Sequence, residues 1–414
     1  MSGVDWERRL YLTAHPFAYP LLRGLARRGP IVRVPRLGVV VNDARLAREV
    51  LMDGETFRKD GPGSPGDLWT PILGPSVLLN MEGEGHRALR RRLTELFTPS
   101  YVDALCARVL AEPLGRMADR LARGGVVDLV DTMRVMAGTV IGEVIGLEAG
   151  TEDDYRHLFE QGEEIVSMVS LRTRRFSPAQ VVRARAVLDP LGDIAAKAYA
   201  AGDESTVMGR MRALGLSEAE ARGAAGAFFL TGTETVATLV PRLIALLSDA
   251  GLLGRVAADP DGLLDRAIDE AMRVTTPTPV MLRSVHRGVE IGGVAVGPGD
   301  RVLIATYNCC RAYGPFDLDR PHPSELRRLW FGAGPHFCIG YPLAMAETRA
   351  VVRTVLAAAP LEITRREAAR GVLIPTYRRL VVRSAGSAGS AGSAGSAGSA
   401  GPARSAGGSA KEAV

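Results

Sequence analysis

Residues 331–347 read Phe331-Gly-Ala-Gly-Pro-His-Phe-Cys338-Ile-Gly-Tyr-Pro-Leu-Ala-Met-Ala-Glu347. This stretch predicts a tight loop, because Gly332 and Gly334 reach positive φ easily and the proline after them fixes its own φ. From Gly340 the sequence is apolar at helical spacing, so a helix should follow the loop. Cys338 then lies just before a helix N-terminus, where free amides and the helix dipole favour a thiolate.

Local chemistry alone leaves more than one role for Cys338. A cysteine nucleophile needs a base, and His336 lies two residues away, but no oxyanion loop or third orienting group is evident. A zinc site needs three or four ligands, and the chain has no Cys-x-x-Cys or His-x-x-x-His pair to supply them. An axial thiolate on heme iron needs one protein ligand in a glycine-lined loop. Heme ligation and an inert buried thiol are the two favoured interpretations at this point.

The composition is that of an ordinary globular protein. The chain has 414 residues, a net charge of +5 and 46% hydrophobic residues. This charge is too small to imply nucleic acid binding, and no basic–aromatic pattern supports it. Four cysteines without a secretory leader favour a reducing compartment, and charged residues interrupt the longest apolar runs. We therefore expect a cytoplasmic monomer with no membrane or nucleic acid partner.

The pattern along the chain predicts a mostly α fold with small β-sheets. Residues 31–41 indicate a hairpin, and further strands are expected near 291–306 and 372–383. Residues 60–76 are rich in glycine and proline and are expected to form a long loop. Ser-Ala-Gly repeats begin at residue 384 and cannot bury a core. The expected organisation is one domain over 1–383 and a disordered tail over 384–414.

Two predicted helices carry polar residues that a core does not need. His86 and Arg90 are four residues apart on one helix face, which is either a solvated basic face or an inward clamp for a buried anion. A long helix over 217–248 should start at a capping box and contains Glu234 and Thr235 among apolar residues. A buried carboxylate is costly unless it is paired or used, so Glu234 is a candidate functional residue.

Two further charged features stand nearer the C-terminus. Glu270 and Arg273 are three residues apart on a helix predicted over 261–274, a spacing that is typical of an exposed ion pair of little energetic weight. Arg283 lies in an apolar strand, so one face of that strand should meet an anion or solvent.

Together these landmarks resemble the cytochrome P450 family, over essentially residues 5–383. The loop from Phe331 to Gly340 is similar to the family's cysteine-ligand signature, Phe-Gly-x-Gly-x-His-x-Cys-x-Gly. Glu270 to Arg273 is similar to the family's Glu-x-x-Arg. Thr231-Gly-Thr-Glu-Thr235 resembles the oxygen-binding segment of the long central helix. The match lies in several motifs in the family's order, which makes it specific.

The resemblance implies a cytochrome P450 fold, heme b (iron protoporphyrin IX) as cofactor, and a role for each matching residue. Cys338 would be the axial iron ligand, with potential tuned by burial and hydrogen bonds. Glu234 and Thr235 would be the catalytic proton relay for O2 activation. The other cofactor-binding residues that the resemblance implies are His86, Arg90, Arg283 and His336, at the heme propionates, and Phe331, Gly332 and Gly340 in the loop.

The implied activity is insertion of one oxygen atom from O2 into a hydrophobic small molecule, in secondary metabolism. Electrons would come from a ferredoxin and a ferredoxin reductase, and outward Arg87 and Arg91 would suit an acidic ferredoxin. The alternatives are a different outcome on the same fold (desaturation, oxidative coupling or peroxide use), a cysteine-nucleophile enzyme, or a non-catalytic heme sensor.

The chain departs from the family pattern at several positions. Thr231, Thr233 and Val236 replace residues that are more usual in the oxygen-binding segment, and Met345 stands where an arginine often follows the signature. Cys309 and Cys310 are adjacent, so we expect reduced packing residues there. Apolar side chains in the segments that would line the substrate pocket favour a terpenoid, a polyketide or an aromatic alkaloid; these side chains are Leu68, Leu73, Leu78, Met168, Phe228, Val280 and Met281.

Overall fold

The structure, a computed structural model, describes residues 4–148, 150–170 and 173–385. The helices in these ranges are α1 (Trp6–Ala14), α2 (Ala18–Ala26), α3 (Ala44–Met52), α4 (Pro65–Leu73), α5 (Gly83–Thr94), α6 (Pro99–Ala122), α7 (Leu129–Ile145), α8 (Glu152–Ser167), α9 (Pro178–Ala201), α10 (Val207–Ala213), α11 (Glu218–Asp249), α12 (Leu253–Ala258), α13 (Pro260–Thr275), α14 (Thr306–Arg311) and α15 (Tyr341–Ala357). The strands are β1 (Ile31–Val34), β2 (Gly38–Val41), β3 (Phe57–Arg58), β4 (Val126–Asp128), β5 (Met281–Val285), β6 (Val289–Ile291), β7 (Val294–Val296), β8 (Arg301–Ile304), β9 (Leu361–Ala368) and β10 (Tyr377–Ser384).

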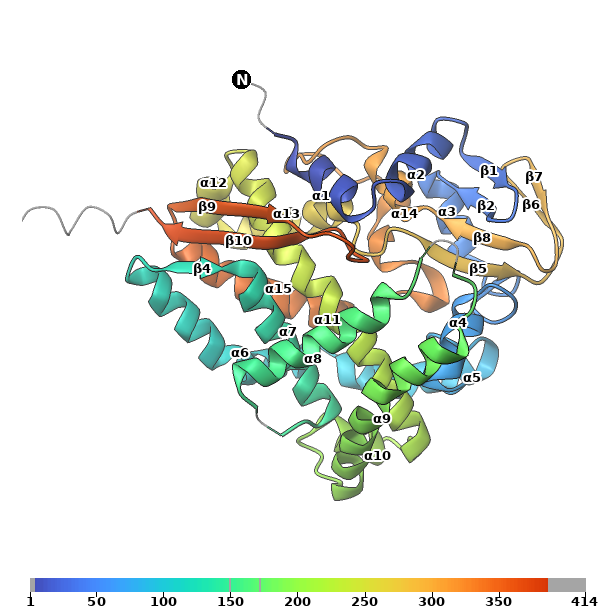
Figure 1. Ribbon diagram of the computed structural model, residues 1–414, viewed down its shortest axis with the longest axis horizontal. Coiled ribbons are helices and arrows are strands. Elements are labelled where there is room, and N and C mark those ends of the chain that lie inside the picture. Colours follow the sequence, from blue (N-terminus) through green and yellow to red (C-terminus); the bar gives the residue numbers. More distant parts are fainter. Residues whose placement is uncertain (1–3, 149, 171–172, 386–414) are drawn as a thin grey trace, which may run out of the picture.

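The prediction of a mostly α chain with small sheets is confirmed. A five-stranded sheet has the order β1-β2-β8-β5-β3, and a three-stranded sheet has the order β4-β10-β9. In Figure 1 the first sheet lies at the right of the molecule, α6 and α7 lie at the left, and α9 and α10 lie at the bottom. The predicted tail, residues 384–414, lies outside the described residues apart from its first two positions.

Two local predictions were wrong. The glycine- and proline-rich stretch 60–76 is not one long loop, because α4 forms inside it. Ser64 caps that helix and Pro65 occupies its first turn, where a missing N–H costs nothing. The strand β9 was also missed; its charged residues pair with β10 in an exposed antiparallel ladder, and tertiary pairing rather than local propensity decides its structure.

The central helix α11 organises the helical part of the fold. Its capping box is present at Ser217, as predicted, and the helix packs against α7, α8, α9, α13 and α15. Gly232 permits the contact with α7, because a Cβ there would lie 2.6 Å from Ile141 Cδ1. The helix stays continuous around Gly232 and Thr235, so the local opening that a glycine and a threonine could allow is not seen.

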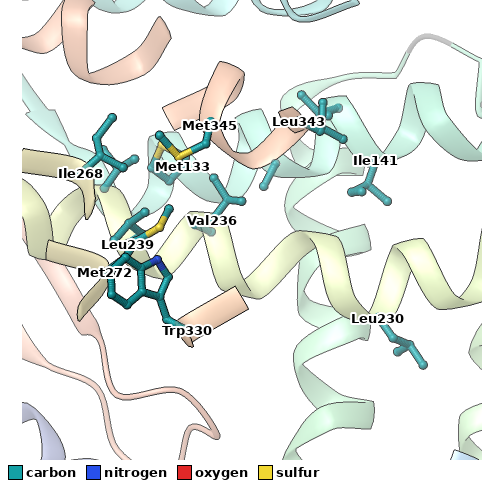
Figure 2. Packing of buried hydrophobic residues seen from close by; sticks show 14 of the residues in the cluster. Met133, Ile141, Leu230, Val236, Leu239, Ile268, Met272, Trp330, Leu343 and Met345 are labelled. Atoms are coloured by element: carbon teal, nitrogen blue, oxygen red, sulfur yellow. The ribbon is translucent and has the colours of Figure 1, made fainter. Parts of the chain in front are cut away.

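By length and composition alone, α11 could cross a membrane. However, 83% of its most apolar window is buried inside the protein, as expected for a core helix. Figure 2 shows this core, in which Val236 and Leu239 of α11 lie with Trp330 and with Met345 of α15. Met345 is therefore a core residue and not part of the outer surface.

Two buried ion pairs fasten distant segments to these helices. Arg242 of α11 is 1% exposed and pairs with Glu7 of α1, while its third nitrogen donates to the carbonyls of Thr275 and Pro375. A substitution that removes either Arg242 or Glu7 would leave the other charge uncompensated in the core. The first helix is thus attached to the middle of the chain and to residues near its end.

The Glu270–Arg273 pair is likewise buried, not exposed as its spacing alone indicates. Arg273 is 0% exposed and donates to Glu270 and to the carbonyls of Cys310, Gly314 and Pro315. Glu270 also accepts from the amide of Asp317 and lies 2.8 Å from His322 Nε2. The pair therefore joins α13 to the segment that leads into the cysteine loop.

Candidate active site

The cysteine loop has the tight geometry that its glycines predict. Gly332 and Gly334 have φ of 82° and 65°. A Cβ on Gly334 would lie 2.6 Å from the carbonyl oxygen of Leu51, so the loop also presses closely against α3. The Cys338 amide donates to the Phe331 carbonyl over 2.9 Å, which fixes the cysteine before α15.

The Cys338 side chain is exposed in the structure. Even so, dense surroundings raise the pKa of the thiol by burial, while the amides of Gly340 and Tyr341 and the cations Lys59 and Arg90 act in the opposite direction. Hydrogen-bond donors and cations of this kind stabilise the thiolate form of a cysteine, which is the form that binds a metal.

One face of α11 is also accessible although most of the helix is buried. Thr231 is exposed and Ala227 and Thr235 are half-buried, at a spacing of four residues. The hydroxyl of Thr235 donates to the carbonyl of Thr231 over 3.1 Å. This accessible stripe of α11 is available to a bound molecule.

Glu234 borders this stripe, about 60° around the helix from Thr231, but it is buried. It is 5% exposed, and its Oε1 has no hydrogen-bond partner. The pKa of Glu234 is raised to about 8, chiefly by burial and also by the charge of Glu163, with the charge of Arg134 acting in the opposite direction. Arg134 of α7 and Glu163 of α8 form a partly exposed ion pair at 3.2 Å. The raised pKa favours the protonated form of Glu234 near neutral pH.

The two predicted histidines meet across the structure. The ring centroids of His86 on α5 and His336 in the loop are 4.1 Å apart. Burial and neighbouring positive groups lower the pKa of His86 to about 3 and that of His336 to about 2, so both rings are neutral. The Nε2 atom of each is buried without a hydrogen-bond partner. Because buried polar atoms are normally hydrogen-bonded, we expect a bound group to supply the partner.

Arg90 and Arg283 approach the same place from α5 and β5. Arg90 is half-buried and donates to the carbonyl of Phe337 over 2.6 Å. Arg283 is buried, donates to the carbonyl of its neighbour Leu282, and has its pKa lowered to about 10 by burial. The hypothesis that His86 and Arg90 turn inward agrees with their burial, whereas Arg87 and Arg91 point into solvent.

Sequence reasoning missed two charged members of this cluster, Lys59 and Glu82. Burial and the charge of Arg283 lower the pKa of Lys59 to about 7. The side chain of Glu82 is buried 2.9 Å from His336 Nε2, although not aligned for a hydrogen bond, and its Oε1 accepts from the Lys59 amide. The local sequence does not mark either residue as part of a site, since each follows a polar stretch that is typical of a loop.

This donor set fits heme. Lys59, Arg90 and Arg283 are three basic groups whose pKa values are lowered by burial, and they lie with the one carboxylate of Glu82. A group with two propionates would stabilise the charged forms of all three. Gly340 has an ordinary φ of −79°, and a Cβ there would meet only Cys338 Sγ at 3.9 Å. Neither the backbone conformation nor the packing of the protein therefore requires a glycine at this position. A flat group bound close to Cys338 would require a glycine at position 340, because a side chain there would obstruct it.

The remaining expected features lie outside this cluster. Cys309 and Cys310 are free and buried, which agrees with a packing role. Leu68 and Leu73 of the expected substrate segment are buried, and Phe228 of α11 stacks on Phe97 at 5.3 Å between ring centroids.

Comparisons with known proteins point in one direction. A sequence model of the cytochrome P450 family matches residues 262–370. A C-19 steroid 1alpha-hydroxylase of Sorangium cellulosum is 32% identical over 300 residues, which are 68% of this chain and 74% of that protein. An erythromycin C-12 hydroxylase of Saccharopolyspora erythraea is 27% identical over 325 residues, 74% of this chain and 78% of that protein.

Solved structures have the same fold. A mutant of P450 EryK in complex with erythromycin B superimposes with a TM-score of 0.75 at 24% identity, over 90% of this chain and 97% of that one. P450BioI in complex with a fatty acid-ligated acyl carrier protein gives a TM-score of 0.75 at 20% identity, over 89% and 98%. The predicted fold is confirmed.

Proposed function

Since this chain belongs to the cytochrome P450 family and is a monooxygenase that uses heme b, we propose that it hydroxylates or epoxidises a hydrophobic small molecule. The observation that carries this proposal is the gathering of Lys59, Arg90, His86 and His336 around the exposed Cys338 thiol. We further propose that Cys338 is the axial ligand of heme iron, and that the cytoplasm is its location.

The cation cluster would hold the two propionates. Arg90 and Arg283 would form charge-assisted hydrogen bonds with them, and Lys59 would add a third cation. His86 and His336 have unpartnered Nε2 atoms that would donate to the same oxygens. Phe331, Gly332 and Gly340 would line the face of the ring, where the absence of side chains on the glycines leaves room.

Bound heme supplies the oxidation chemistry, namely O2 activation and transfer of one oxygen atom to the substrate. The contribution of this chain is to deliver protons and to position the substrate. The pKa of Glu234, raised to about 8, keeps a proton available near neutral pH, and the Arg134–Glu163 pair lies toward solvent from it. The Thr235 hydroxyl, on the accessible stripe, would pass that proton inward.

Bacterial members of the family generally need redox partners. We propose a ferredoxin and its reductase, with the exposed arginines Arg87 and Arg91 on α5 as part of the docking surface. We also propose secondary metabolism as the setting, since the relatives include enzymes that are named for a steroid and a macrolide. A terpenoid, polyketide or aromatic alkaloid substrate fits the apolar side chains along the expected pocket segments.

The proposal is tested by the colour and spectrum of the purified protein. It should be red, and its reduced carbonyl adduct should show the strongly red-shifted band of thiolate-ligated iron. Cys338→Ala should abolish this band, and Cys106→Ala, which changes a buried cysteine elsewhere, should keep it. A colourless protein, or an unchanged band in Cys338→Ala, would contradict the assignment.

A further inference from the structure

Arg328, which precedes the cysteine loop, has an unusual backbone conformation. Its φ and ψ are 52° and 32°, in the left-handed region. It is one of three residues other than glycine with a positive φ in the part of the chain that the structure describes. A residue with a side chain adopts this conformation at a cost, and it persists only where the surrounding contacts over-determine it. The contacts of Arg328 show what holds it there.

The backbone of Arg328 begins the turn that leads into the cysteine loop. Its carbonyl accepts from the Phe331 amide over 2.8 Å, and the Phe331 carbonyl accepts from the Cys338 amide over 2.9 Å. Trp330, in the middle of the turn, is 4% exposed and lies in the core shown in Figure 2. Two successive hydrogen bonds therefore join Arg328 to the backbone of Cys338.

The side chain of Arg328 reaches the other end of the same loop. Its guanidinium carbon lies 4.7 Å from the ring centroid of Tyr341, the first residue of α15. The Tyr341 ring also packs edge-on against Phe331 at 5.0 Å and tilted against Phe337 at 5.7 Å between ring centroids. A guanidinium within about 6 Å of an aromatic ring is attracted to its face. Arg328 thus contacts both ends of the loop, one through its backbone and one through its side chain.

A carboxylate on α13 restrains the Arg328 side chain further. Burial raises the pKa of Asp269, and the positive charges of Arg328 and His322 act in the opposite direction. The Oδ1 atom of Asp269 is buried and has no hydrogen-bond partner. The Arg328 guanidinium is therefore attracted to Asp269 as well as to the Tyr341 ring, and this double attraction limits the freedom of its side chain.

The Tyr341 end of the loop supplies hydrogen bonds to the cysteine sulfur. Burial raises the pKa of the Cys338 thiol, and hydrogen bonds from the amides of Gly340 and Tyr341 act in the opposite direction. Hydrogen bonds to a ligating sulfur withdraw electron density from it, and such bonds tune the reduction potential of the metal. A residue that fixes the first turn of α15 therefore acts on the metal through the sulfur.

We propose that Arg328 is a positioning residue that holds the Tyr341 amide on the Cys338 sulfur and thereby raises the reduction potential of the bound heme. The proposal rests on the proposed role of Cys338 as the axial ligand. Arg328 needs no contact with heme for this role, because it acts through the Tyr341 ring and through the turn at Phe331.

The test compares holoproteins that show the red-shifted carbonyl band, so failure of the proposed function is recognised in the parent before any potential is measured. Arg328→Asn removes the cation and the stack, while asparagine tolerates the left-handed backbone. In a spectroelectrochemical titration, the ratio of reduced to oxidised heme at the parent's midpoint potential should fall at least about threefold. That fall equals about 28 mV for a one-electron couple, at about 59 mV for each tenfold change. An unchanged ratio would overturn the proposal.

Tyr341→Leu separates the stack from the charge, because it removes the ring and keeps the Arg328 guanidinium. It should lower the ratio as much as Arg328→Asn does, and the double variant Arg328→Asn/Tyr341→Leu should lower it no further. Additive effects would show that Arg328 acts independently of Tyr341 and would refute the assignment. If Arg328→Asn fails to retain heme, Tyr341→Leu decides alone, by the same threefold criterion.

Arg327→Asn is the matched control, since it removes a positive charge from the neighbouring, exposed position. Its reduction potential should equal that of the parent, and an equal fall in both arginine variants would assign the effect to net charge and overturn the proposal. Hydrogen–deuterium exchange of the same holoproteins gives a second readout. The Tyr341 amide should exchange faster in Arg328→Asn than in the parent or in Arg327→Asn, and equal rates would contradict the positioning role.

Discussion

Arg90 donates a 2.6 Å hydrogen bond to the carbonyl of Phe337, which is 247 positions further along the chain. The bond joins α5 directly to the cysteine loop, so Arg90 has a structural partner as well as a proposed propionate. We therefore expect Arg90→Ala to lower the ratio of heme to protein and to weaken the red-shifted carbonyl band. Arg87→Ala, on the exposed face of α5, should keep the parent heme content. Equal heme content in both variants would mean that the bond is dispensable.

Lys59 offers a test of the cation cluster. Lys59→Met keeps the length of the side chain but removes the charge that we assign to a propionate. Transfer of heme to apomyoglobin should be about tenfold faster than from the parent, and Lys59→Arg should restore most of the retention. Identical transfer rates in the parent and Lys59→Met would remove Lys59 from the site.

Thr235→Ala tests the proton relay. Removal of the hydroxyl should leave substrate binding intact but lower the yield of product per electron consumed, with hydrogen peroxide formed instead. Thr231→Ala removes an exposed hydroxyl from the same stripe of α11 and provides the matched comparison. If coupling in Thr235→Ala stays at the parent level, the relay is wrongly assigned.

Glu234 should make the folded protein less stable as the pH rises. The pKa of Glu234 is about 8 in the folded state and 4.5 in the unfolded state. Between these pH values the folded protein binds one more proton than the unfolded protein, so the free energy of unfolding falls as the pH rises from 4.5 to 8. Glu234→Gln removes the effect, and its gain in unfolding free energy over the parent should grow by up to about 4 kcal/mol from pH 4.5 to pH 8.

Urea unfolding at several pH values, followed by circular dichroism, measures this difference. Glu347 of α15 has a pKa raised to about 8 by burial as well, so Glu347→Gln should show the same direction. A difference for Glu234→Gln that does not change with pH would show that the carboxyl is hydrated in solution.

The buried pair of Glu270 and Arg273 predicts a large loss of stability. Arg273→Ala leaves the Glu270 carboxylate buried without its cation, which typically costs about 3–5 kcal/mol. Arg255→Ala breaks an exposed pair with Asp319 and should cost less than about 1 kcal/mol. Similar urea midpoints for the two variants would contradict the burial of the first pair.

The parts of the fold that follow local rules were predictable from sequence. The capping box at Ser217 and the glycines before Cys338 each dictate their own backbone, and the structure has them as expected. The helix α4 was not predicted, since its glycines and prolines suit a loop equally well until Ser64 caps its first turn.

The site was predictable only where a residue belongs to a local motif. The resemblance supplied His86 and His336, but Lys59 and Glu82 take their roles from neighbours more than twenty residues away. The same reason explains the wrong expectation for Glu270 and Arg273. Their spacing is visible in the sequence, while the segment 310–322 that buries them is not.

The attachment of Arg242 has a consequence for the order of events during synthesis. Glu7, its counterion, is synthesised 368 positions before Pro375, another of its partners (375 − 7). At about 5–20 residues per second, Pro375 follows Glu7 by on the order of tens of seconds, so the set of partners around Arg242 is completed late. The anchoring of α11 through Arg242 is therefore complete only after Pro375 has been synthesised.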